Sequence, residues 1–248
     1  MAVIPEDAPI PVRDPLAGQI DAFWARLGQP GTWWTGEQRV AIIEETRNAV
    51  GCAYCARCKE AVSPFAESGE HDHLSALPDA IVDVIHRLVN DPGRLTRTWY
   101  RRTIDSGVTE GEYVETAAIV ADVICVDTFQ RGLGLPLPAL PDVVAGEPSR
   151  ETPECVETTI AWVPTVPRDK ATGELAETWY PDGKRVFVPH VRQAFSLVPD
   201  ECVAFMRLSA EMYIDNKDMN DFAAGRTLKR PQMELLAART SLLNECFY

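Results

Sequence analysis

Apolar residues recur at intervals of three and four positions from Leu16 to about Leu135, a spacing that restricts this part of the chain to helices. One of these helices opens with the capping-box signature of Thr35 and Gln38, and we expect it to run to about Val50. The other helices expected here are one with apolar residues at 20, 23, 24 and 27, one holding a cysteine cluster, and those at 78–90, 94–106 and 110–132. The sequence therefore predicts an all-α protein.

A run of Gly132, Gly134 and three prolines ends this helical pattern. Residues 156–163 are rich in β-forming side chains, and residues 179–188, around Asp182-Gly183, are predicted to form a β-hairpin. Helical spacing then resumes near Val191. We therefore divide the chain into an extended lead-in (1–15), a first helical domain (16–140), a linker with a β-hairpin (141–187) and a second helical domain (188–248).

The two helical domains share a short internal repeat, in which residues 38–54 align with residues 232–248. The alignment matches Gln38 with Gln232, Thr46 with Thr240, Cys52 with Cys246 and Tyr54 with Tyr248. A cysteine and an aromatic residue thus coincide at the end of both segments, and this predicts two related helical units in tandem.

The charge balance excludes several classes of partner. With 24 Lys and Arg against 37 Asp and Glu, the net charge is -13, which argues against binding to nucleic acid or to an anionic membrane. Apolar runs stay below the roughly 18 residues that a membrane span needs. The first residues show neither a basic nor an apolar targeting region. We expect a cytoplasmic protein with no nucleic acid and no membrane as partner.

The chemistry of the chain is indicated by Cys52-Ala-Tyr-Cys55, with Cys58 following one turn later. In a chain without a secretory signal, this spacing is typical of redox or metal chemistry. At the start of a helix, backbone N–H groups favour the thiolate, and the second sulfur is near enough to close a disulfide. A peroxide would oxidise one thiolate to a sulfenic acid, which would condense with the neighbouring thiol.

Residues 232–248 carry a further pattern, because Glu234 precedes Cys246 by eleven intervening residues and Asn244 and Tyr248 flank that cysteine. This segment resembles the signature of the alkylhydroperoxidase D-like (carboxymuconolactone decarboxylase) superfamily. The family signature is a Glu, eleven residues, C-x-x-C, and a His four residues after the second Cys. The resemblance implies an all-α fold of two tandem units, with Glu234 and Cys246 as catalytic residues of the second.

The first unit has a complete C-x-x-C but departs from the family pattern at two positions. Val40 stands at the Glu position and Lys59 at the His position. Glu44, one turn beyond Val40 on the same helix face, is the first candidate to replace the missing Glu, and Glu45 is the second. The charge of Lys59 would lower the pKa of a nearby thiol.

The second unit is incomplete, because Tyr248 stands one position before the family's second redox residue. Some relatives carry selenocysteine at that position, encoded by a codon usually read as stop. We therefore expect the sequence to be that of a selenoprotein homologue truncated at the selenocysteine codon.

The resemblance implies a thiol-dependent enzyme of peroxiredoxin type, a peroxidase-like dithiol oxidoreductase. By analogy with the family's second redox position, Cys55 would be peroxidatic and Cys52 resolving. The substrate would be a hydroperoxide, and the reductant an external dithiol: a lipoyl protein, a thioredoxin-like protein or a small thiol. No cofactor is implied beyond the cysteine pair, and a homo-oligomer is expected.

Three alternatives remain open. A zinc-binding structural domain would use Cys52, Cys55, Cys58 and a His, either His71 or His73. The family's decarboxylase branch acts on a lactone acid and needs no C-x-x-C, so the intact pair argues against it. The third alternative is an inactive fragment.

The remaining cysteines and histidines are predicted to be structural. Cys58 is interpreted as a small buried residue, and Cys125, Cys155 and Cys202 as core or linker residues. His71 and His73 are placed in a solvated loop, and His86 is expected to be a partly buried helix residue.

Overall fold

The computed structural model describes residues 2–74, 76–184, 188–215, 218–219, 221–223 and 227–244. In these ranges the regular structure is helical, apart from one isolated antiparallel bridge between Glu157 and Thr165, so the all-α prediction is confirmed. The α-helices are α1 (Asp14–Arg26), α2 (Gly36–Ala49), α3 (Ala53–Glu60), α4 (Asp79–Asn90), α5 (Arg97–Asp105), α6 (Glu110–Gly132), α7 (Gly173–Trp179), α8 (His190–Gln193), α9 (Pro199–Met212) and α10 (Arg230–Leu243).

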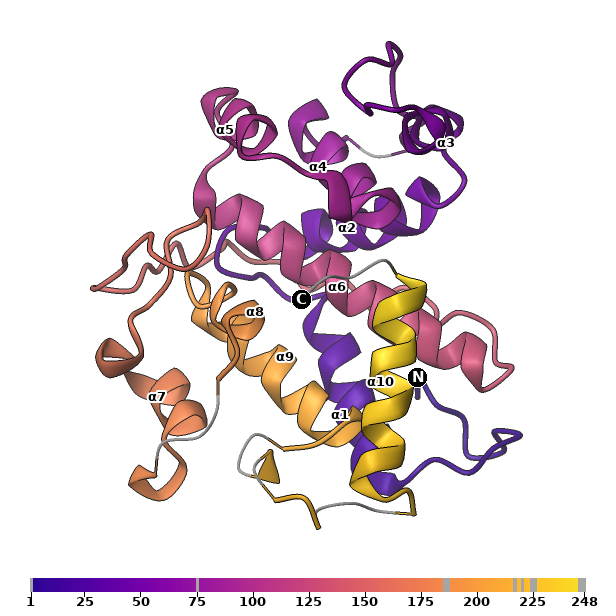
Figure 1. Cartoon of the computed structure of the whole chain (residues 1–248), viewed down its shortest axis with the longest axis vertical. Coiled ribbons are helices and arrows are strands. Elements are labelled where there is room, and N and C mark those ends of the chain that lie inside the picture. The colour runs from indigo at the N-terminus through magenta and orange to yellow at the C-terminus, as the bar shows by residue number, and fades with distance from the viewer. Residues whose placement is uncertain are drawn as a thin grey trace.

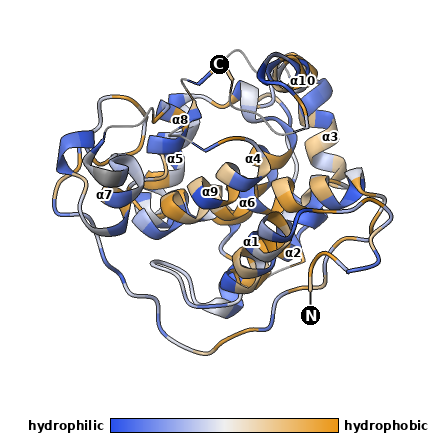
Figure 2. Cartoon of the chain, turned by 90° about the horizontal axis from the view of Figure 1, so that it is seen from below, coloured by the Kyte–Doolittle hydropathy of each residue, from blue (hydrophilic) through white to orange (hydrophobic). Residues whose placement is uncertain are grey.

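The longest helix, α6, crosses the middle of the molecule, with α2 and α4 packed together on one side of it (Figure 1). Ile42 and Ile43 of α2, Ile85 of α4 and Ile119 of α6 are fully buried in one core. Thr35 and Gln38 form the predicted capping box at the start of α2. Hydrophobic segments gather where α1, α6 and α9 meet (Figure 2).

Helix α1 buries the stripe expected from the sequence. Ile20 and Leu27 are completely buried, and Phe23 and Trp24 are nearly so. This face packs against the core and α9, so the second half of the chain covers the first. None of the helices in the described ranges combines the length and apolar character required to cross a bilayer.

A buried ionic network joins α1, α2, α6 and α9. The side chain of Arg39 is fully buried and pairs with Glu115 and, at 2.8 Å, with Glu201. Arg26 also pairs with Glu201. Burial favours the neutral acid, yet the two guanidinium groups lower the pKa of Glu201 to about 2. Because a buried charge needs a partner, this network fixes the four helices relative to one another.

Two carboxyl groups of α6 near this network have pKa values that are raised, in contrast to that of Glu201. Burial raises the pKa of Glu115 to about 7, although Arg39 opposes the shift. Burial also raises the pKa of Asp122 well above its ordinary value, and the charge of Glu201 adds to the effect. Neither carboxyl oxygen of Asp122 has a hydrogen-bond partner among the described residues. These surroundings therefore favour the neutral acid form of Asp122.

The β-hairpin predicted at residues 179–188 is wrong for the residues that the structure describes. Trp179 ends helix α7, Pro181–Gly183 is a 3-10 turn, and residues 185–187 lie outside the described residues. Leu175 and Trp179, four positions apart, bury one helix face against α9, and this packing outweighs the turn preference of Asp-Gly. Gly183 still turns the chain, with a φ of 70°.

Helices α2 and α10 occupy equivalent positions in the internal repeat, since the alignment carries Gly36 onto Arg230 and Ala49 onto Leu243. The alignment also preserves two local hydrogen bonds. Gln38 and Gln232 each accept a bond from the backbone N–H three residues earlier, and Thr46 and Thr240 each donate to the carbonyl four residues earlier. Both kinds of bond are common in helices, so the repeat stays a prediction.

The two helices differ in what covers them. Ile42, on α2, is buried under neighbouring helices, whereas its equivalent on α10, Leu236, is 54% exposed. Leu235, Leu242 and Leu243 of α10 are more than two-thirds exposed. The described part of the chain thus leaves one apolar helix face open to solvent.

Candidate functional site

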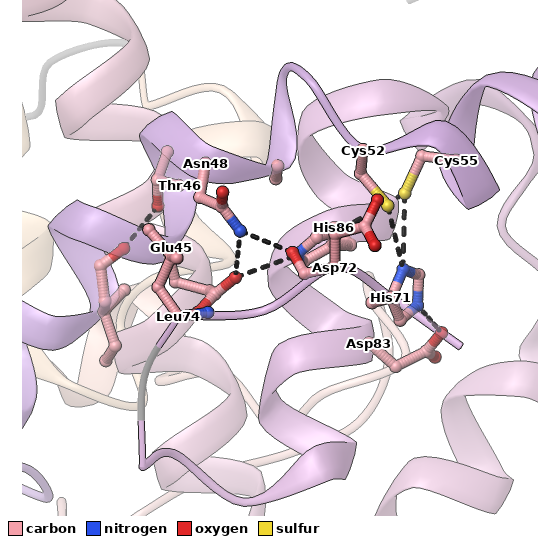
Figure 3. Close-up of polar contacts among 12 residues, drawn as sticks. Glu45, Thr46, Asn48, Cys52, Cys55, His71, Asp72, Leu74, Asp83 and His86 are labelled. Atoms are coloured by element: carbon pink, nitrogen blue, oxygen red, sulfur yellow. Dashed lines mark hydrogen bonds and ion pairs between the residues drawn. The ribbon is translucent and has the colours of Figure 1, made fainter.

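Four side chains from adjacent segments form a compact group, here called the Cys–His cluster: Cys52, Cys55, His71 and His86. Their sulfur and nitrogen atoms all lie within 4.8 Å of one another. Cys52 is the N-cap residue of α3 and Cys55 lies in its first turn, His71 is in the loop before α4, and His86 is on α4 (Figure 3). Both cysteines and His86 are buried, and His71 is 10% exposed at its side chain.

The two imidazoles converge on one sulfur. Cys55 Sγ lies 3.3 Å from Nδ1 of His71 and 3.3 Å from Nδ1 of His86. Cys52 Sγ lies 3.9 Å from the same Nδ1 of His71. The two rings are themselves in contact, with their centroids 4.3 Å apart. The arrangement therefore offers each sulfur a nitrogen that can take its proton.

A carboxylate holds the far side of each ring. His71 Nε2 lies 2.9 Å from Asp83 Oδ1, and His86 Nε2 lies 2.9 Å from Glu45 Oε1. Because a carboxylate only accepts hydrogen bonds, Nε2 carries the proton in both rings. In the neutral form of each ring, Nδ1 therefore presents its lone pair to the sulfurs.

Neighbouring groups fix these two carboxylates. Trp99 Nε1 donates to Asp83 at 2.7 Å. Asn48 Nδ2 and the backbone N–H of Leu74 donate to the two oxygens of Glu45, each at 3.0 Å, and Glu45 is fully buried. The orientation of the rings is thus set by α2, α4 and the loop between α3 and α4.

The turn between α2 and α3 places the cysteine pair. Helix α2 ends at Ala49, the chain turns through Val50 and Gly51, and Cys52 is the N-cap residue of α3. Burial alone would raise the pKa of Cys52, but hydrogen bonds from the backbone of Cys55 and Asp72, and from His71, lower it overall. Cys52 is therefore the cysteine whose environment favours the thiolate.

The pKa values of the other three members of the cluster are shifted in different directions. Burial raises the pKa of Cys55, and the neighbouring Cys52 adds to this shift. Burial opposes the charged form of His71, yet the bonds to Asp83 and Cys52 raise its pKa overall. Burial lowers the pKa of His86 despite its bond to Glu45. These surroundings therefore favour the thiolate at Cys52 and the protonated ring at His71, and they disfavour the charged forms of Cys55 and His86.

The structure brings Cys52 and Cys55 into the cluster but not the two other residues predicted for the first unit. Glu44 is exposed, because the face of α2 that points to α4 carries Glu45 instead. Lys59 is exposed near the end of α3, where its carbonyl accepts a bond from Arg94. Glu45, the second candidate for the carboxylate, is therefore the one that reaches the site.

Of the residues predicted for the second unit, the structure describes Glu234, which makes its contacts outside the cluster. Glu234 accepts hydrogen bonds from Tyr213, at 2.6 Å, and from Arg230, and its side chain is 46% exposed. Cys246 and Tyr248 lie outside the described residues. Cys58 is buried, as expected, but it is not part of the Cys–His cluster.

Sequence reasoning missed the role of His71, His86 and Asp83. The placement of His71 in a solvated loop is wrong, because the loop folds back and bonds the ring between Asp83 and the sulfurs. His86 is completely buried on an otherwise apolar face beside Ile85. A buried polar residue needs a partner, but the partner of His86 is Glu45, forty-one positions earlier, so no local pattern could indicate the pair.

Comparisons of the chain with protein-family models, with curated proteins and with solved structures found no match. The Cys–His cluster itself is therefore the basis for the function proposed below.

Proposed function

We propose that the protein is a thiol-dependent oxidoreductase that reduces hydroperoxides through a disulfide cycle between Cys52 and Cys55. The observation that carries the proposal is the pair of Nδ1 atoms, both 3.3 Å from Cys55 Sγ, on rings held by carboxylates. A dithiol cycle must remove one proton from each sulfur and return protons to oxygen leaving groups. Paired imidazoles perform such transfers near neutral pH.

The first half of the cycle uses Cys52. Its position at the start of α3, with backbone hydrogen bonds from Cys55 and Asp72, favours it over Cys55 as the attacking sulfur. This reverses the order suggested by the family analogy. The thiolate attacks the outer peroxide oxygen, the O–O bond breaks, and the leaving alkoxide takes a proton from His71. The products are an alcohol and a sulfenic acid on Cys52.

The second half closes the disulfide. Cys55 gives its proton to His86, and its sulfur attacks the sulfur of Cys52. The S–S bond forms as the S–O bond breaks, and the departing hydroxide takes the proton from His86 to become water. An external dithiol then returns two electrons and two protons to the pair. Glu45 and His86 would thus supply the carboxylate and imidazole that the family pattern places at other positions.

We also propose two related helical units, self-association and a cytoplasmic location. The equivalence of α2 and α10 supports two related units, and the exposed leucines of α10 support self-association. Neighbouring free thiols at 52, 55 and 58 favour a reducing compartment such as the cytoplasm.

The test is peroxide consumption with a dithiol reductant. We expect wild type and Cys58→Ser to turn over, and Cys52→Ser and Cys55→Ser to fall to the background rate. Cys58 is the matched control, since it is a buried cysteine of the same helix outside the cluster. A sulfenic-acid trap should label Cys52 in the Cys55→Ser protein. Equal rates in all four proteins would remove the proposal.

A further inference from the structure

We propose that Cys52, Cys55, His71 and His86 bind one zinc ion when the cysteines are reduced. The four donor atoms lie within 4.8 Å of one another and come from four buried or nearly buried side chains. This site goes beyond the dithiol cycle and stands on geometry alone. It also differs from the zinc site considered in the sequence, because two histidines take part and Cys58 does not.

The distances match those of a tetrahedral zinc site. With Zn–S near 2.3 Å and Zn–N near 2.0–2.1 Å, the edges of the ligand tetrahedron are roughly 3.3–3.8 Å. The two distances from Cys55 Sγ to the imidazole Nδ1 atoms are both 3.3 Å, and that from Cys52 Sγ to His71 is 3.9 Å. The other donor pairs lie within 4.8 Å, so shifts of about 1 Å or less would bring all four donors around one ion.

The second layer of contacts is of the kind that zinc sites use. A histidine that binds zinc through one nitrogen usually donates its other N–H to a carboxylate, which orients the ring. His71 makes this bond to Asp83 and His86 makes it to Glu45, each at 2.9 Å. Both rings therefore aim an unprotonated Nδ1 at the centre of the cluster. The two carboxylate–histidine pairs therefore support a metal site in addition to the distances between the donor atoms.

The donor set selects the class of metal. Two thiolates and two neutral imidazoles balance the charge of a divalent ion, so the loaded site is neutral inside the protein. Sulfur and imidazole donors suit zinc, whereas magnesium and calcium require oxygen. Four protein ligands leave no open position, which is typical of a structural site. The ion would tie the start of α3 to α4 and to the loop between them.

Zinc and the disulfide exclude each other, because both use the same two sulfurs. When a hydroperoxide oxidises the loaded site, each sulfur gives up one electron and the S–S bond forms. The O–O bond breaks, two protons from water complete an alcohol and a water molecule, and the zinc ion leaves. This release step rests on the proposed function, but the binding of zinc to the reduced protein does not.

The first experiment measures metal in the reduced full-length protein. We expect one zinc per chain, and Co²⁺ added to the metal-free protein should give the absorption of a tetrahedral thiolate site. Zinc should protect Cys52 and Cys55 from alkylation while the exposed Cys155 reacts freely. Absence of stoichiometric zinc and of the cobalt spectrum would overturn the site, whatever the peroxide assay shows.

Variants assign the ligands. Cys55→Ala and His86→Ala should lower zinc affinity by more than about tenfold, since each removes a direct ligand. Cys58→Ala and His73→Ala are the matched controls and should bind as wild type does. If Cys58→Ala loses zinc as Cys55→Ala does, the four-residue assignment is wrong. Should a ligand variant fail to fold, alkylation protection in the wild-type protein still decides between the outcomes.

Discussion

His86 Nε2 lies 2.9 Å from Glu45 Oε1, and both side chains are completely buried. This contact joins α2 to α4 beneath the cysteine pair. It determines the tautomer of His86, because the carboxylate accepts the Nε2 proton and leaves Nδ1 free to face Cys55. The chemistry proposed for Cys55 therefore depends on a residue that never touches a sulfur.

We predict that Glu45→Ala lowers dithiol-dependent peroxide turnover by roughly tenfold to a hundredfold, because His86 loses the group that orients it. The backbone N–H of Leu74 would also lose its acceptor. Steady-state kinetics should show the loss in kcat more than in KM, since Glu45 does not contact substrate in the proposal. Glu44→Ala is the matched control, because Glu44 is exposed on the same helix. Equal losses in both variants would contradict the positioning role.

The helices of the first domain were predictable because each carries its own periodic signal. The stripe of α1 and the cap of α2 are local patterns, and the structure confirms them. The β-hairpin expected from residue 179 was wrong because the Asp-Gly turn signal is local, whereas the burial of Trp179 at the end of α7 depends on α9. Tertiary packing outweighed the local preference for a turn in this segment.

The candidate site was predictable only in part, for the same reason. The spacing of Cys52 and Cys55 is a local signal, and it indicated the two cysteines that lie in the Cys–His cluster. His71 and His86 lie sixteen and thirty-one positions beyond Cys55, and only the fold of the loop and of α4 brings them to it. No spacing rule links residues across such distances. The choice between Glu44 and Glu45 likewise depended on which face of α2 meets α4.

We predict that Asp122→Asn stabilises the protein increasingly as the pH rises from about 4 to 7. Burial raises the pKa of Asp122 in the folded state, so the folded protein holds a proton that the unfolded chain releases. By linkage, the wild-type contribution is fully present below the ordinary carboxyl pKa and is lost as the pH rises. Asn cannot ionise and avoids that loss. Melting temperatures across this range measure the difference.

The control for this prediction is Asp105→Asn, on the exposed surface of α5. Its melting temperatures should follow those of wild type at every pH. If the difference between Asp122→Asn and wild type stays constant from pH 4 to 7, Asp122 does not hold its proton in the folded protein.

We predict that Glu201→Gln destabilises the protein by about 3–5 kcal/mol, because it leaves the buried Arg39 and the partly buried Arg26 without their shared carboxylate. Arg26 and Arg39 both pair with Glu201, whose side chain is 1% exposed. Urea unfolding at neutral pH measures the change. The exposed pair of Arg207 and Glu174 provides the contrast, and Glu174→Gln should change stability by less than about 1 kcal/mol. Similar effects in both variants would show that burial does not set the strength of these pairs.

We predict that the open face of α10 drives self-association and that Leu236→Glu and Leu243→Glu weaken it. These leucines are 54% and 71% exposed, and contiguous apolar surface of this kind favours contact with another chain. A charge placed there would have to be desolvated on association, which opposes it. Sedimentation velocity over a range of protein concentrations measures the shift toward monomer. Val62→Glu is the matched control, because Val62 is fully exposed in a loop away from α10. If the α10 variants associate as strongly as wild type and Val62→Glu do, the contact between chains lies elsewhere on the surface.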